Sequence, residues 1–68
     1  MDIERIFTYQ PPTDDQTPKY NELREAAKAF ALTIEKCCPA CADRSAAIRL
    51  VREAVMTANA AIALDGHV

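Results

Sequence analysis

Residues 17–37 read T-P-K-Y-N-E-L-R-E-A-A-K-A-F-A-L-T-I-E-K-C, and this stretch decides the fold. Thr17 can cap the free N–H groups at a helix start, and Pro18 at the first helical position loses no hydrogen bond. Apolar side chains then recur at steps of three and four residues, which places them on one stripe of a helix. They are Tyr20, Leu23, Ala27, Phe30, Ile34 and Cys37. Because Pro39 ends the pattern, we predict an amphipathic helix over residues 18–37.

A second helical pattern follows the cysteine–proline turn and begins near Asp43 or Ser45. One apolar stripe again has steps of three and four residues, and a second apolar row widens it. The stripe is Ile48, Val51, Val55, Ala58 and Ile62, and the row is Ala47, Leu50, Ala54, Ala61 and Leu64. Gly66 ends the pattern, so we predict a helix over residues 43–64. The connection between the two helices is short, so they should be antiparallel neighbours.

The N-terminal quarter of the chain has a different character. Residues 2–7 hold three apolar anchors and predict a short helix, whereas residues 8–17 contain two prolines and two aspartates and predict a loop. Long loops in small proteins are often functional. We see no strand pattern, so residues 1–68 should form a single all-α domain, a short helix followed by a helical hairpin.

Composition indicates that this hairpin does not act alone. Half of the 68 residues are hydrophobic, and much of that share is alanine. A chain this short buries only about 60% of the surface its unfolded form exposes, and small scaffolds rely on disulfides, metals or partner chains. The helix over residues 43–64 is apolar on more than one side, which is more than a two-helix hairpin can cover. We therefore predict a homo-oligomer.

Charge and hydropathy exclude two classes of partner. The net charge is −2, whereas a binder of duplex nucleic acid needs a basic surface. No apolar run reaches the roughly 18 residues of a membrane span. The first residues, M-D-I-E-R-I, carry acids where a signal peptide would be basic. These features predict a soluble intracellular protein without a membrane partner.

Three cysteines, Cys37, Cys38 and Cys41, crowd the turn between the predicted helices. The C-x-x-C spacing from Cys38 to Cys41 raises the hypothesis of metal or redox chemistry. A closed zinc site needs a fourth ligand, and His67 lies at the far end of the second predicted helix. We therefore favour structural thiols and predict neither a metal site nor a cofactor, while the thiol hypothesis stays open.

We find no catalytic set in the sequence. No serine or cysteine has a histidine nearby, and the chain has neither a glycine-rich phosphate loop nor an H-E-x-x-H motif. Most of its carboxylates belong to helix surfaces, where they solubilise the protein. The sequence therefore predicts a protein that is not an enzyme.

A few polar residues have two readings each. Arg24 and Lys28 share a helix face, which forms either a solvated surface or a clamp for phosphate. Tyr9, in a polar proline-stiffened loop, either packs on its own core or stacks on a base. Asn59 interrupts an apolar stretch, A-N-A-A-I-A, and serves either helix register or ligand contact.

Several segments together carry a family resemblance. They are R-I-F-T-Y-Q-P-P near the start, the Gln16…Tyr20-x-x-Leu23-Arg24 run, the alanine-rich helix ending in C-P, D-R-S-A-A-I, and E-A-V-M-T-A-N-A-A-I-A. In their order and spacing the chain resembles the phage-encoded anti-CBASS nucleotide sponges, whose hairpin domain is shared with anti-Thoeris sponges. CBASS is a bacterial antiphage defence that signals with cyclic oligonucleotides.

The resemblance implies a function and a site. Members assemble as hexamers, bind cyclic dinucleotides between protomers and, in some cases, cyclic trinucleotides elsewhere, and sequester them uncleaved in the cytoplasm of the infected host. By resemblance the dinucleotide site comprises an aromatic, Tyr9, with Gln10 and Pro11 beside it, and a basic residue, Arg24, with Lys28 one turn on. The competing hypothesis is a small helical interaction protein whose apolar face docks a protein partner.

Overall fold

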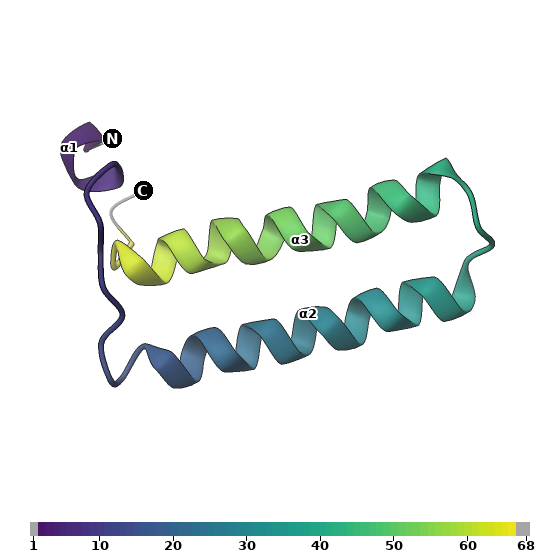
Figure 1. The fold of residues 1–68 in the computed structure, drawn as a ribbon, viewed down its shortest axis with the longest axis horizontal. Coiled ribbons are helices and arrows are strands. Elements are labelled where there is room, and N and C mark those ends of the chain that lie inside the picture. The colour runs from purple at the N-terminus through teal and green to yellow at the C-terminus, as the bar shows by residue number, and fades with distance from the viewer. Residues whose placement is uncertain (1, 67–68) are drawn as a thin grey trace.

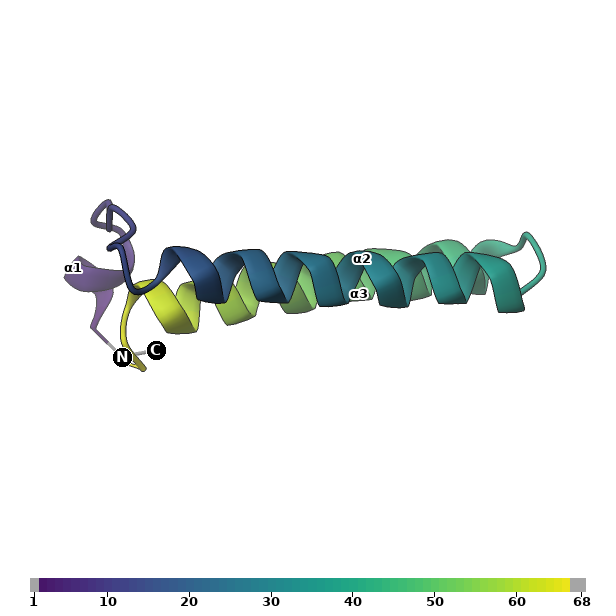
Figure 2. The same cartoon turned by 90° about the horizontal axis from the view of Figure 1, so that it is seen from below.

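The computed structural model describes residues 2–66 and is all-helical over that range. Its helices are α1 (Ile3–Ile6), α2 (Thr17–Cys37) and α3 (Ala42–Ala63). α2 and α3 lie antiparallel, and α1 lies off the end of the hairpin where α2 begins and α3 ends (Figures 1 and 2). The predicted all-α fold with a helical hairpin is confirmed. Each helix end lies within one residue of the expected bounds of 2–7, 18–37 and 43–64.

The start of α2 differs in detail from the expected cap. Thr17 lies inside the helix, and its hydroxyl donates to the Thr13 carbonyl at 3.2 Å, so its predicted capping role is wrong. A turn that begins at Thr13 winds directly into the helix, because the N–H groups of Gln16 and Thr17 both donate to the Thr13 carbonyl. Pro18 lies in the first turn, where its missing N–H leaves no partner unpaired.

Gln16 ties this turn to the C-terminal end of α3, which lies at the same end of the hairpin. Its Oε1 accepts the Thr13 N–H at 3.1 Å, and its Nε2 donates to the Ile62 carbonyl at 3.1 Å. Carbonyls in the last turn of a helix have no partner within the helix. One side chain therefore holds the loop, the start of α2 and the end of α3 in register.

The cysteine turn closes the other end of the hairpin. Cys41 is the N-cap of α3, and its Sγ accepts the Arg44 N–H at 3.4 Å. The Arg44 Nη1 donates to the carbonyls of Glu35 and Cys38 at 3.4 and 3.3 Å, at the C-terminal end of α2. α3 therefore begins just before Asp43, since the cysteine itself supplies the cap.

α3 ends in a Schellman motif. The Gly66 N–H donates to the Ala61 carbonyl at 3.0 Å, and the Asp65 N–H donates to the Ile62 carbonyl at 3.2 Å. Both Asp65 (φ 49°) and Gly66 (φ 79°) have left-handed backbone. Gly66 was expected to end the helix, but Asp65 occupies the position that glycine usually takes in this motif.

The hairpin is a thin layer without an enclosed core. Its principal extents are 42 × 25 × 15 Å, and Leu64 is the one buried apolar residue among residues 2–66. The stripes that meet along the α2–α3 seam are only half-buried, and Phe30 and Leu50 remain 58% and 60% exposed. Within this described range, no helix is long and apolar enough to cross a membrane.

Candidate functional site

A polar hollow lies at the loop end of the hairpin, between the loop, the first turns of α2 and the C-terminal part of α3. Its volume is about 350 Å³. Its walls are Gln10, Pro12, Thr17, Tyr20, Asn21, Arg24 and Asn59. All of them except Pro12 carry a hydrogen-bonding side chain. The hollow is therefore suited to a ligand with several polar groups.

Helical spacing explains why α2 contributes most of this wall. Thr17, Asn21 and Arg24 recur at steps of four and three residues, so they lie on one face. Tyr20 lies at the edge between this polar face and the apolar seam, and it is half-buried. Arg24 is exposed and brings a positive charge to the wall of the hollow.

Asn59 is the contribution of α3 to the hollow, and its side chain is half-buried. Its Oδ1 is buried and accepts no hydrogen bond from the described part of the chain. Buried amide oxygens in native proteins nearly always have a partner. The Nε of Arg5, in α1, is a second buried polar atom without a partner within residues 2–66.

The hollow brings together two of the five site residues expected from sequence, Gln10 and Arg24. Tyr9, Pro11 and Lys28 are exposed and do not line it. Tyr9 and Gln10 are adjacent in the loop, but only Gln10 lines the hollow. Lys28 lies one turn beyond Arg24 on the same face, past the edge of the hollow. The roles of all five in binding remain predictions.

Sequence reasoning did not assign Pro12, Thr17, Tyr20 or Asn21 to a site. Tyr20 was read as part of the apolar stripe, and Thr17 as a helix cap. The helical spacing of Thr17, Asn21 and Arg24 is the sequence feature that indicates a shared polar face. From the sequence, Asn59 had two interpretations, helix register and ligand contact, but neither placed this residue beside Arg24.

A comparison with protein families decides the affiliation of the chain. The model of the family described as Acb2/Tad1, hairpin domain, matches residues 1–63. The chain belongs to this family. Its members are anti-CBASS and anti-Thoeris sponges, so membership implies a general role in binding cyclic oligonucleotides, and the predicted resemblance is confirmed. We found no curated protein and no solved structure that matches the chain.

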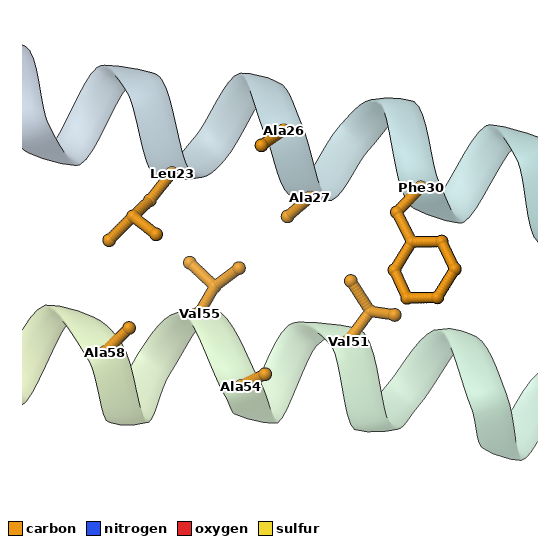
Figure 3. Close-up of a pocket in the computed structure, with 8 residues that line it drawn as sticks. All are labelled: Leu23, Ala26, Ala27, Phe30, Val51, Ala54, Val55 and Ala58. Atoms are coloured by element: carbon orange, nitrogen blue, oxygen red, sulfur yellow. The ribbon is translucent and has the colours of Figure 1, made fainter.

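An apolar groove runs along the other side of the hairpin of this Acb2/Tad1 family member. Its central part has a volume of about 330 Å³, and Figure 3 shows Leu23, Val51 and Val55 pointing into the space between the helices. Its walls are Leu23, Ala26, Ala27, Phe30, Val51, Ala54, Val55 and Ala58. Two further hollows extend this groove along the seam between α2 and α3. One shares Leu23 and lies toward the start of α2, and the other shares Phe30 and lies toward the cysteine turn. The two sides of this hairpin thus differ sharply in polarity.

The cysteines of this family member are free and exposed. Among residues 2–66, no group of three or more histidine, cysteine or acidic side chains is placed to hold a metal ion. His67, considered as a ligand from sequence, lies outside the described residues. The contact of the Cys41 Sγ with the Arg44 N–H supports a structural role for at least one thiol.

Proposed function

We propose that this protein is a non-catalytic sponge that binds cyclic dinucleotides and so blocks CBASS immunity; whether it also takes cyclic trinucleotides is tested by the ligand panel below. The observation that most strongly supports this proposal is that the chain belongs to the Acb2/Tad1 hairpin family. A sponge needs no acid, base or nucleophile, because binding alone lowers the free messenger by mass action. A phage-encoded sponge would act in the cytoplasm of the infected bacterium.

Arg24 is the proposed phosphate contact, with Lys28 adding charge one turn along α2. Cyclic oligonucleotides carry one negative charge per linkage, and Arg presents several N–H donors in a planar fork that suits phosphate oxygens. Gln10 lines the same hollow and can donate or accept through its side-chain amide. This division of roles gives the hollow both charge and hydrogen-bonding capacity.

Tyr9 is the proposed stacking residue, and its position favours a site shared between chains. The side chain is 82% exposed and does not line the hollow of its own chain. Its ring is free to stack on a base held beside Arg24 of a neighbouring copy. Pro11 restricts the backbone just after Gln10 and so helps to present the ring.

The apolar groove supports assembly of several copies. An exposed apolar surface rimmed by polar residues is typical of an interaction site, and this chain buries little of its own apolar surface. We assign the groove to a second copy, and the number of six follows from family analogy. Light scattering should then give six times the chain mass of 7.5 kDa.

A pair of charge substitutions tests this assignment. Phe30→Glu, in the groove wall, should reduce the assembly to smaller species. Leu32→Glu alters a side chain of similar exposure that lies outside the groove, so it should leave the mass unchanged. Dissociation by Leu32→Glu alone would place the interface on the other side of α2.

Ligand recovery tests the function itself. Purified protein is mixed with a panel of cyclic di- and trinucleotides, separated from free ligand and heated, and the released compounds are analysed. Intact nucleotide is the expected product. No retained ligand from any member of the panel would overturn the proposal, and cleaved nucleotide would make the protein a nuclease.

The apolar groove also suits the competing hypothesis, docking of a different protein. That function gives no role to the polar hollow on the opposite side of the hairpin. It predicts a single-chain mass for the isolated protein and no retained cyclic nucleotide. The mass and the ligand recovery together therefore distinguish the two functions.

A further inference from the structure

We propose that Asn59 determines base specificity, with its Oδ1 accepting a hydrogen bond from the exocyclic amine of a nucleobase. This inference rests on the proposed function, since it takes the ligand to be a cyclic oligonucleotide. The ligand class is one with at least one amino-bearing base, in which the amine lies beside a ring nitrogen, as in adenine.

The buried oxygen of Asn59 is the first observation. Oδ1 is shielded from solvent, yet no hydrogen-bond donor within residues 2–66 reaches it. A buried acceptor without a partner destabilises a protein, whereas the same acceptor becomes favourable when a donor arrives. An oxygen in this state is poised for a donor from outside the chain.

A purely structural role explains Asn59 less well. An interior asparagine that sets helix register does so by pairing with a polar group on the facing helix. Here the register between α2 and α3 has another polar tie, the hydrogen bond from Gln16 Nε2 to the Ile62 carbonyl. Asn59 lies one turn before Ile62 and makes no comparable bond through Oδ1.

The surroundings of Asn59 suit a base edge. Asn59 lines the hollow, so its side chain forms part of the hollow wall although Oδ1 itself is shielded from solvent. Asn59 comes from α3 and Arg24 from α2, and both line the same hollow. One ligand can therefore place a phosphate on Arg24 and a base on Asn59.

The chemistry of a side-chain amide selects the amino-bearing base. An amide offers an acceptor oxygen beside donor N–H groups, and adenine offers an amine donor beside a ring nitrogen acceptor. Asparagine pairs with adenine in this bidentate way in protein–DNA complexes. A base without the amine leaves Oδ1 unpaired and should bind more weakly.

The test compares two ligands on three proteins. The ligands are cyclic diadenylate and its analogue in which both adenines are replaced by purine without the 6-amine. The wild-type protein should bind cyclic diadenylate about tenfold more tightly, the effect of one net hydrogen bond. Asn59→Leu, of similar volume, should bind both ligands within about twofold of each other. Asn59→Asp keeps an acceptor oxygen and should retain the preference.

The outcomes separate this inference from the proposed function. Equal binding of both ligands by the wild-type protein would overturn the role of Asn59 and leave the sponge in place. A preference that persists in a folded Asn59→Leu would assign it to another residue and would also overturn the inference. If neither these ligands nor any other cyclic oligonucleotide binds, the proposed function itself fails. Equal binding by the wild-type protein overturns the inference without any variant, so the inference can fail even if Asn59→Leu does not fold.

Discussion

The two ends of the hairpin treat their polar groups in opposite ways. At the cysteine turn, Arg44 donates to the carbonyls of Glu35, in α2, and Cys38, just after it, and Cys41 caps α3, so side chains of this turn pair with backbone groups at both helix ends. At the loop end, Gln16 makes the structural bonds, while Asn59 Oδ1 and Arg5 Nε are buried without partners in the described chain. This difference underlies our proposal that the cysteine-turn end, here called the closed end, serves stability, whereas the loop end, here called the open end, binds the ligand.

The largest expected effect is at the open end. Arg24→Ala should weaken cyclic-dinucleotide binding about 10- to 100-fold, because a charge-assisted hydrogen bond contributes about 1.5–3 kcal/mol. The measurement is calorimetric titration, with light scattering to confirm unchanged assembly. Lys36→Ala removes a positive charge near the closed end and should bind normally. Equal losses in both variants would indicate a general charge effect and no local contact.

Removal of the Tyr9 ring should have a comparable or slightly smaller effect. Base stacking contributes about 1–3 kcal/mol, so Tyr9→Ala should weaken binding about 5- to 100-fold. Tyr9→Phe keeps the ring and should bind nearly as well as the wild type in the same titration. Normal binding by Tyr9→Ala would show that Tyr9 is not the residue that stacks on the base.

The side chains of Gln16 and Arg44 each make two hydrogen bonds at one end of the hairpin, so replacing them tests directly how the two ends differ. Gln16→Ala and Arg44→Ala each remove two hydrogen bonds and should lower the free energy of unfolding by about 1–2 kcal/mol. Chemical denaturation checks this loss. Gln16→Ala should also weaken ligand binding, because it frees the loop and the register of the hollow, whereas Arg44→Ala should not. Weakened binding in both variants would mean that the ends are coupled.

A smaller effect is expected where α3 terminates beside the open end. Asp65 has φ 49°, and left-handed backbone disfavours residues with a Cβ, so Asp65→Gly should raise the free energy of unfolding by about 0.5–1 kcal/mol. Thermal denaturation measures the gain. Gly66→Ala is the control, with the opposite expected sign. A Cβ at this position meets no atom within 4 Å, so any loss of stability should come from the left-handed backbone alone.

The smallest effect concerns pH. The hydrogen bond from Thr13 Oγ1 lowers the pKa of the Asp15 carboxyl from its ordinary value, and Lys19 assists. A lowered pKa stabilises the fold at pH above the unfolded value, and this contribution is lost as pH falls through the folded value. Thr13→Val should return the Asp15 pKa toward normal in an NMR titration. An unchanged pKa would assign the shift to the backbone.

The sequence by itself determined the hairpin. Steps of three and four residues over 20–37 and 48–64 predicted both long helices to within one residue, because helical periodicity is a local property of the chain. The short turn required antiparallel neighbours, and the surplus of apolar residues indicated an incomplete core, which the exposure of Phe30 and Leu50 bears out. Gln10 was proposed from family resemblance alone, whereas the helix face shared by Arg24 and Lys28 had already raised a phosphate clamp as one of two interpretations.

Only the tertiary structure decided which polar side chains share the hollow. Gln10, Arg24 and Asn59 are distant in sequence, and they meet because the Gln16 bond to Ile62 and the winding of the loop set the relation of α3 to α2. The unpaired state of the Asn59 oxygen is likewise invisible in sequence, since it depends on what the facing helix does not supply. Local pattern determines helices, but long-range register determines which of their side chains form a site.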